Sequence, residues 1–301
     1  MQFAVNYSEP LVKLLQSGKA EVDLIKLPAW PELIDKALDV APCYIHLPLS
    51  VGNGFGDAYD TEKKKKVDWD FIESLMKRTH TPIVNVHLAP EATFYPALEN
   101  DPWNEETYAR IFEETVRDIE GVIRLCGKEM VIAENPFPEN ASVNVNSNPN
   151  FVRNVIEETD IGFLLDISHA RLSSRALGLG EFEYLMQLPL ERTQEIHITG
   201  IKILEGELLE KLLQNRPKEF DITEFIGVEI DHQSMSEDDF GFLERVYLLI
   251  QNGICREPWV ASMEHGGIGS FWELSLDERV LAEQVPRLYN MTHSVKVKEV
   301  A

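Results

Sequence analysis

The sequence predicts an α/β fold of the (β/α)8 barrel type, and two patterns in its 301 residues lead to that prediction. Short apolar runs alternate with amphipathic segments along most of the chain, as parallel strands alternate with helices. A histidine or an acidic residue stands at or just after the end of most of these runs. In a barrel of this kind, the carboxyl ends of the strands share one rim, where catalytic groups gather.

The first half of the chain contains four of the predicted strands, beginning with the apolar run 3–7. Leu11, Leu14 and Leu15 have helical spacing within 9–17, and Gly18 is a typical helix stop. Because the later runs have the same lengths and turn signals, the same reasoning extends to them. Further strands are expected at 23–27, 43–47 and 83–87, and helices at 33–40, 69–79 and 104–126.

The second half continues the alternation, and no linker-like change in composition divides it from the first. We therefore expect a single TIM-barrel domain over 1–301. A doubly wound sheet is disfavoured because no GxGxxG follows the first strand and no GxxxxGK[ST] occurs. Strands are expected at 130–134, 162–166, 194–199 and 259–264, and helices at 151–158, 208–213 and 238–252.

Two long segments follow predicted strands on the catalytic rim, at about 50–68 and 135–149. Both are longer than an ordinary connection between a strand and a helix. The first is rich in glycine, so we expect either a lid or binding loop or a disordered segment. The tail VKVKEV predicts an accessory strand or a frayed end.

The composition excludes some classes of function. The formal net charge is −23, which opposes nucleic-acid partners because those need Lys and Arg to displace phosphate counterions. No apolar run approaches the roughly 20 residues of a membrane span, and the first residues lack the pattern of a secretory signal. We expect a cytoplasmic protein. Cys43, Cys126 and Cys255 are far apart, which argues against disulfides and a thiolate zinc site.

The polar residues at the strand ends predict a divalent-metal centre. Carboxylates that end buried strands are costly to desolvate unless a cation or a hydrogen bond compensates. Imidazole and carboxylate groups on one rim suit zinc, manganese or iron. Both Asp231 and His232 can be ligands only if the backbone there is irregular, because adjacent residues of a strand point opposite ways. The predicted ligands are His46, His87, Glu134, Asp166, His169, His197, Asp231, His232 and Glu264.

Several neighbouring residues are candidates for catalysis or substrate binding. The catalytic candidates are Glu134, Glu264, His265 and Lys26. Asn6 and Asn135 are placed to contact a substrate or to orient ligands. Arg171 would clamp an anionic group or make a surface salt bridge. His80 and His293 lie off the pattern.

With these residues in order, the chain resembles the xylose-isomerase-like TIM barrel superfamily. Two of its families share the order His, His, Glu, Asp-x-x-His, His, Asp/His pair, Glu. They are the endonuclease IV family, with three zinc ions, and the multinuclear non-haem iron-dependent oxidase family. The pair Glu134–Asn135, the segment LLDISH and the spacing His197-x-x-Gly200 resemble the iron family.

That resemblance implies a di- or trinuclear site, with iron first and zinc or manganese as alternatives. The iron family usually spaces its Asp and His by one residue after the seventh strand, so the resemblance leaves either Asp231 or Glu229 as the carboxylate ligand there. It also implies an oxidase or oxygenase acting on a small molecule or on cysteines of a peptide, alongside a partner protein. Three other functions remain open. One is a sugar isomerase or epimerase with one ion held by Glu134, Asp166, His197 and Glu264. The others are a metal-dependent phosphoester hydrolase and a non-catalytic module.

Overall fold

The computed structural model describes residues 1–91, 94–95, 104–138, 145–215, 222–266, 273 and 275–297. The chain folds as two compact units. The terminal unit consists of Met1–Tyr44 and Glu195–Ala301, and the middle unit is Ile45–Gln194. The expectation of one domain over 1–301 stays a prediction.

The terminal unit is built on parallel strands that carry predicted site residues near their carboxyl ends. β1 pairs with β2 and β13, and β13 also pairs with β10, all in parallel. The register places Asn6 opposite Lys26 and His197 opposite Ser262, so each pair shares one face of the sheet. The bounds are β1 (Gln2–Asn6), β2 (Leu24–Pro28) and β13 (Val260–Met263). Two further strands cross the boundary between the units: β3 (Cys43–His46) ends in the middle unit, and β10 (Thr193–Ile198) begins there.

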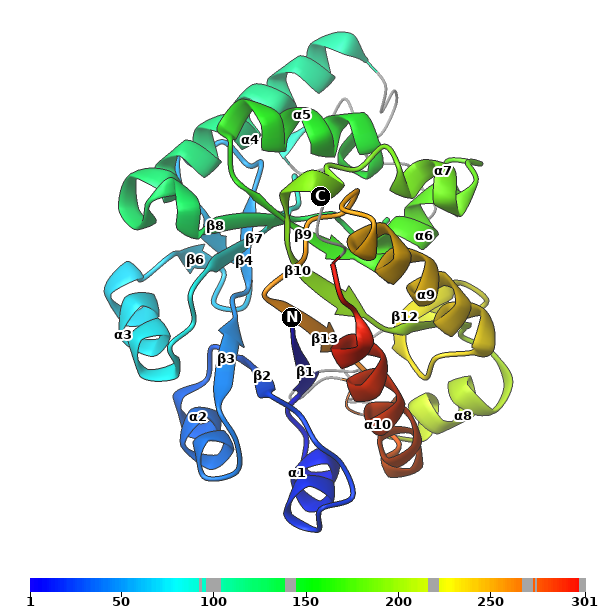
Figure 1. Ribbon diagram of the computed structural model, residues 1–301. Coiled ribbons are helices and arrows are strands. Elements are labelled where there is room, and N and C mark those ends of the chain that lie inside the picture. The colour runs from blue at the N-terminus through cyan, green and yellow to red at the C-terminus, as the bar shows by residue number, and fades with distance from the viewer. Residues whose placement is uncertain are drawn as a thin grey trace. The chain divides into compact units, whose positions relative to one another are not determined.

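Helices cover these strands. α10 packs on β1 and β13 and lies beside α1 (Figure 1), while α2 packs on β2. Leu11 and Leu14, one turn apart, bury the inner face of α1, as their spacing predicts. Asp277 begins α10 by accepting a hydrogen bond from the backbone N–H of Arg279. The bounds are α1 (Glu9–Gln16), α2 (Pro31–Leu38) and α10 (Glu278–Ser294).

A two-stranded antiparallel sheet and two helices follow β10 in the same unit. β11 and β12 pair with an irregularity between Gly200 and Lys202. Leu204, Leu212, Ile222 and Ile230 form a small hydrophobic core in this part of the chain. The bounds are β11 (Gly200–Ile203), α8 (Gly206–Asn215), β12 (Glu229–Gln233) and α9 (Glu237–Gln251). His232 therefore lies in a strand, where a loop was expected.

The middle unit contains a second set of parallel strands, in the order β9–β8–β7–β4, followed by the antiparallel pair β5–β6. Ser50 faces His87 across β4 and β7, and His87 faces Glu134 across β7 and β8. These three residues form one row on one face of the sheet. The bounds are β4 (Leu49–Val51), β5 (Tyr59–Asp60), β6 (Lys65–Lys66), β7 (Val84–Leu88), β8 (Val131–Glu134) and β9 (Gly162–Asp166).

Five helices belong to the described part of the middle unit. α4 lies beside α5 and also contacts β4 and β8 (Figure 1). Asn104 and Asn148 begin α4 and α5 with side-chain hydrogen bonds to the first turn. The bounds are α3 (Trp69–Thr79), α4 (Glu105–Cys126), α5 (Pro149–Thr159), α6 (Ile167–Ala176) and α7 (Glu181–Leu185).

The glycine-rich segment after β4 is held in place by one buried carboxylate. Asp118 of α4 accepts hydrogen bonds from the backbone N–H groups of Gly52, Asn53 and Gly54 at 3.0 Å and of Gly56 at 2.6 Å. Burial raises the pKa of Asp118, and these hydrogen bonds act in the opposite direction. The sequence predicts a lid, a binding loop or a disordered segment here. In the structure, the hydrogen bonds to Asp118 hold residues 52–56 against α4.

The predicted strands are all present, and the differences lie between them. α6, α7 and α10 cover segments for which no helix was predicted, and β4, β5, β6, β11 and β12 are additional strands. In the second long loop, 139–144 lie outside the described residues, and a 3-10 turn covers Val145–Ser147. The tail predicted as a strand or frayed end lies partly outside them. The three cysteines are free thiols. Among the described helices, none has the length and apolar character needed to cross a bilayer.

Candidate metal centre

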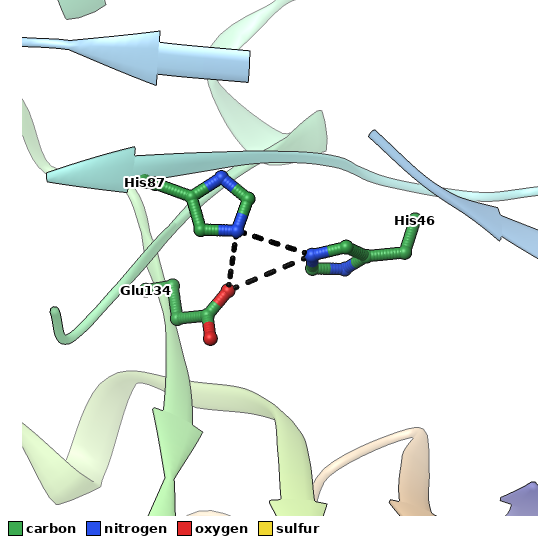
Figure 2. Close-up of side chains that lie close together, drawn as sticks. All are labelled: His46, His87 and Glu134. Atoms are coloured by element: carbon green, nitrogen blue, oxygen red, sulfur yellow. Dashed lines mark hydrogen bonds and ion pairs between the residues drawn. The ribbon is translucent and has the colours of Figure 1, made fainter. Parts of the chain in front are cut away.

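Three predicted ligands of the middle unit meet at the ends of β3, β7 and β8. Figure 2 shows the rings of His46 and His87 and the carboxylate of Glu134 pointing toward one another. Nε2 of His87 lies 3.1 Å from Oε2 of Glu134 and 3.2 Å from Nε2 of His46. Nε2 of His46 lies 3.7 Å from the same Glu134 oxygen. The group can hold a metal ion by the spacing of its donor atoms.

The hydrogen bonds around the rings fix where the lone pairs lie. Nδ1 of His87 is 2.9 Å from the carbonyl oxygen of Leu49, which can only accept, so Nδ1 carries the proton. The Asn85 amide, held by the backbone of Leu47, directs its Nδ2 toward Nε2 of His46 at 3.2 Å. Both Nε2 atoms are thus unprotonated, as metal-ligating imidazole nitrogens are, and an ion bound to His46 would take the place of the Asn85 hydrogen bond.

The spacing of the three donor atoms fits a shared ion. Two atoms that each lie about 2.1 Å from one metal are about 3.0 Å apart at a right angle and about 3.4 Å apart at the tetrahedral angle. The separations of 3.1 and 3.2 Å lie within this range, and the separation of 3.7 Å corresponds to a wider angle of about 120° at the ion. Converging lone pairs are stabilised by a cation between them, so the donor set fits a divalent metal.

The second oxygen of Glu134 points to a further pair of predicted ligands. Oε1 of Glu134 lies 3.6 Å from Nδ1 of His169, and Nε2 of His169 lies 3.7 Å from Oδ2 of Asp166. Oδ1 of Asp166 accepts hydrogen bonds from Ser168 Oγ and from the backbone N–H of His169. Asp166 therefore begins α6 and places His169 in the first turn of a helix, where a loop was expected.

Asn135 positions this second pair. Its side chain donates to the carbonyl of Asp166 at 2.9 Å and accepts from the N–H of Asp166 at 2.8 Å. Its own carbonyl accepts from Nδ1 of His169 at 2.9 Å, which leaves Nε2 of His169 as the ligand atom. Of the two roles expected for Asn135, these contacts provide the orienting one, and substrate contact stays a prediction.

A second cluster of predicted residues lies in the terminal unit. Nζ of Lys26 is 2.7 Å from Nε2 of His197 and makes a short ion pair with Glu264. Nδ1 of His197 lies 3.4 Å from the other oxygen of Glu264. All three side chains are buried. The Lys26 ammonium thus supplies a positive charge to Glu264, and the metal-ligand roles of His197 and Glu264 stay predictions.

Glu195 joins this cluster and was missed from the sequence. Its Oε1 lies 3.0 Å from Nε2 of His197 and accepts a hydrogen bond from the Tyr44 hydroxyl at 2.8 Å. Burial, and then the Glu195 charge, raise the pKa of Tyr44 well above its usual value. The available signal was the spacing of Glu195 and His197, because residues two apart in a strand share one face.

The side chains of Asp231 and His232 lie close together because the backbone of β12 is irregular. His232 has φ 56, in the left-handed region, and its Nε2 lies 3.8 Å from Oδ2 of Asp231. Nδ1 of His232 is 3.2 Å from the carbonyl oxygen of Gly266, which also accepts from the Asn6 side chain at 3.3 Å. Asn6 and His232 thus contact the same carbonyl, and the metal-ligand roles of Asp231 and His232 stay predictions.

The remaining predicted residues have structural partners. Nε2 of His265 accepts a hydrogen bond from the N–H of Asp277 at the start of α10, and burial lowers the pKa of His265 to about 4. Arg171 donates to Glu181 at 2.9 Å and joins α6 to α7. Arg171 is buried, so this ion pair is not the surface salt bridge of the alternative, and the anion-clamping role stays a prediction. Catalysis by His265, Lys26 and Glu264 stays a prediction.

Comparison with known families decides the family of the chain. A family model described as "RiPP precursor modification enzyme MbnB/TglH/ChrH" matches residues 60–213, about half of the sequence. The chain belongs to this family. The matched region contains His87, Glu134, Asp166, His169 and His197. The predicted xylose-isomerase-like TIM barrel superfamily is confirmed, and family and donor set together support a metal-dependent TIM-barrel enzyme.

Individual curated relatives resemble the chain over less than half of its length. The UPF0276 protein RB0508 of Rhizobium meliloti (strain 1021) is 30% identical over 135 residues, which cover 42% of this chain and 41% of that protein. A UPF0276 protein of Paraburkholderia phytofirmans is 30% identical over 133 residues, covering 43% and 42%. The chain thus spans less than half the length of the curated relatives it matches.

A solved structure supports the fold class. A D-psicose 3-epimerase crystallised in the presence of D-fructose matches with a TM-score of 0.50 over 98% of this chain and 99% of that chain. The sequence identity is 14%, so the likeness concerns the fold alone. The α/β TIM-barrel fold class predicted from the sequence is confirmed.

Proposed function

We propose that the protein is a multinuclear non-haem iron oxidase or oxygenase that modifies a peptide. The observation that carries the proposal is the triangle of His46 Nε2, His87 Nε2 and Glu134 Oε2, with edges of 3.1 to 3.7 Å. The family match to enzymes that modify precursor peptides supports a peptide substrate. The sequence resemblance adds cysteine as the modified residue and a partner protein as part of this proposal.

In this proposal, His46, His87 and Glu134 would hold one ion. His169 and Asp166 would help to hold a second ion, with the other Glu134 oxygen 3.6 Å from the His169 ring. Bound Fe(II) with open coordination positions would supply the activation of O2 and a binding point for a substrate heteroatom. The protein side chains hold the ions and orient their ligands: Leu49 and Asn135 fix the rings of His87 and His169 through backbone carbonyls.

The test combines a metal inventory with a reaction assay. The protein is purified without oxygen and loaded with Fe(II), and its metal content is measured by mass spectrometry. Oxygen uptake and peptide mass are then followed with a pool of cysteine-containing peptides, and with a matched pool in which serine replaces cysteine. We expect iron-dependent oxygen uptake and a mass change in the cysteine pool only.

Variants connect this activity to the centre. Glu134→Gln removes the carboxylate charge and should abolish oxygen uptake, whereas Glu157→Gln, an exposed change on α5, should leave it unaltered. Stoichiometric zinc without iron activity would contradict the proposal. Exchange of sugar hydrogens with D2O in the absence of O2 would instead support the isomerase.

A further inference from the structure

Three aromatic rings of the middle unit lie together at its surface. Phe55, in the glycine-rich segment, is 41% exposed, and Phe94 is 39% exposed. The ring centroid of Phe55 lies 5.4 Å from that of Phe94 and 5.4 Å from that of Tyr59 in β5. Single exposed apolar residues are ordinary, but exposed rings in mutual contact are typical of interaction sites.

A run of lysines borders these rings. The register of β5 and β6 pairs Tyr59 with Lys66, so the two side chains lie on the same side of the two strands. Lys63 forms an ion pair with Asp60 at 3.2 Å. The lysines at 64–66 are exposed, and no ion pair joins them to another residue in the described part of the chain. We call Phe55, Tyr59, Phe94 and Lys66 the aromatic–lysine face.

The backbone that presents Phe55 is fixed before any partner binds. The N–H groups of Gly54 and Gly56, on either side of Phe55, donate to Asp118 at 3.0 and 2.6 Å. A segment that is already ordered loses little conformational entropy when it makes a contact. The exposed ring of Phe55 is therefore suited to bind an apolar side chain of a partner.

The aromatic–lysine face adjoins a cavity of about 420 Å³ beside the metal centre. Thr61, the residue after β5, lines this cavity together with His87 and His169. Glu91 also lines it, and the Glu91 carbonyl accepts a hydrogen bond from the N–H of Phe94 at 3.0 Å. The volume lies within the usual range of ligand pockets. A peptide that places one side chain in the cavity can thus extend over the face.

The charge at this face is opposite to that of the whole chain. Residues 61–66 contain four lysines and one glutamate, whereas the net charge of the chain is −23. At physiological ionic strength, screening weakens interactions between exposed charges that are more than about 8 Å apart. The nearby lysines therefore dominate the potential that a bound molecule experiences, and a negatively charged ligand is favoured here.

We propose that the aromatic–lysine face binds an acidic segment of the substrate peptide, an inference that rests on the proposed function. An apolar side chain of this segment packs against Phe55 and Phe94, and its carboxylates lie beside the lysines at 64–66. The segment is next in sequence to the residue that enters the cavity. The face would thus select substrates by charge and hold them beside the metal centre.

The test measures binding to the full, metal-free chain, so it does not depend on turnover. The probe is a capped peptide in which aspartate and phenylalanine alternate. Two matched peptides replace every aspartate by asparagine, or every phenylalanine by alanine. Isothermal titration gives the affinity of each peptide at low and at high salt.

Two variants of the face are each compared with a matched control. Phe55→Ala is compared with Leu248→Ala, a change at a 54% exposed leucine on α9. The second variant replaces all three lysines at 64–66 by glutamine. Its control makes the same replacement at Lys13, Lys19 and Lys36, three exposed lysines of the terminal unit, and so removes the same charge. All of these side chains are exposed, so folding should be unaffected, and thermal melting checks this.

We expect Phe55→Ala to weaken binding of the acidic peptide about tenfold, as for the loss of one aromatic anchor. Replacement of the lysines at 64–66 should weaken it about fivefold at low salt, and about 0.5 M salt should remove this difference. The asparagine peptide should bind the wild type and the lysine variant equally. Both controls should bind the acidic peptide as the wild type does.

Equal binding of the acidic and asparagine peptides to the wild type would overturn the proposal, and so would unchanged binding by both face variants. A dimer in sedimentation that Phe55→Ala dissociates would also overturn it, because a second copy of the chain would then occupy the face. Peptide binding with the expected pattern but without iron-dependent turnover would support the docking surface and contradict only the proposed function.

Discussion

Oε2 of Glu134 lies 3.1 Å from Nε2 of His87. The other ring nitrogen of His87, Nδ1, is hydrogen-bonded to the carbonyl oxygen of Leu49. The register of β7 and β8 sets the contact between Glu134 and His87, because the two residues face each other across the sheet. A carboxylate and an oriented imidazole are thereby brought together by backbone pairing, before any ion binds. This relationship leads to the first prediction.

Glu134 should control the protonation of His87 in the metal-free protein. Burial lowers the pKa of His87, but the charge of Glu134 and its hydrogen bond outweigh that effect, so the pKa is raised. Imidazolium is therefore lost at a higher pH than usual, and metal affinity should rise as pH rises through this pKa. Glu134→Gln should lower the pKa of His87, measured by NMR of the ring; Glu157→Gln should not change it.

Lys26 and Glu264 should behave as a coupled buried pair. Lys26→Met leaves the Glu264 carboxylate without its ammonium partner, so the metal-free protein should lose about 3–5 kcal/mol of unfolding free energy. Lys26→Met combined with Glu264→Gln should recover much of that loss, because the buried charge is then removed. Urea unfolding of the four proteins measures the coupling. Additive losses in the double variant would show that the two side chains do not interact.

Asp118 should determine the order of residues 52–56. Asp118→Ala leaves several buried backbone N–H groups without their acceptor, which should cost about 3 kcal/mol. Limited proteolysis should then cleave within this glycine-rich segment, whereas Glu120→Gln, an exposed change on the same helix, should leave it resistant. If the segment stays resistant in Asp118→Ala, other contacts hold it.

The eight expected strands could be predicted because each is a short apolar run with a polar residue at or near its end. Short polar strands such as β5 and β6 have no such pattern and were not predicted. The 278–294 helix was missed because Pro286 lies inside it and interrupts the pattern. His169 was expected in a loop, but Asp166 begins a helix by accepting a hydrogen bond from the backbone N–H of His169. An aspartate three residues before a helical N–H is a common helix cap, and that interpretation of the sequence was overlooked. The position of the 52–56 segment depends on Asp118, more than sixty residues away, and no local pattern reveals it.

For the metal centre, residue types and order were sufficient to find the His46, His87 and Glu134 group. The hydrogen-bond and ion-pair partners of the site residues could not be predicted, because only folding brings them together. The orienting role of Leu49 depends on a backbone carbonyl, which every residue has. Pairing of Lys26 with Glu264 joins residues 238 positions apart, and only the register of the terminal unit brings them together.

The most direct test of the central claim is the number of metal ions bound per chain, with their positions located by anomalous scattering. We predict more than one Fe(II) or Zn(II) ion in the wild type, with Glu134 between two of them. Glu134→Gln should lose this binding, while His80→Asn, an exposed histidine in the left-handed conformation that asparagine tolerates, should retain it. A wild type without metal near Glu134, or a Glu134→Gln variant with unchanged metal content, would contradict the account.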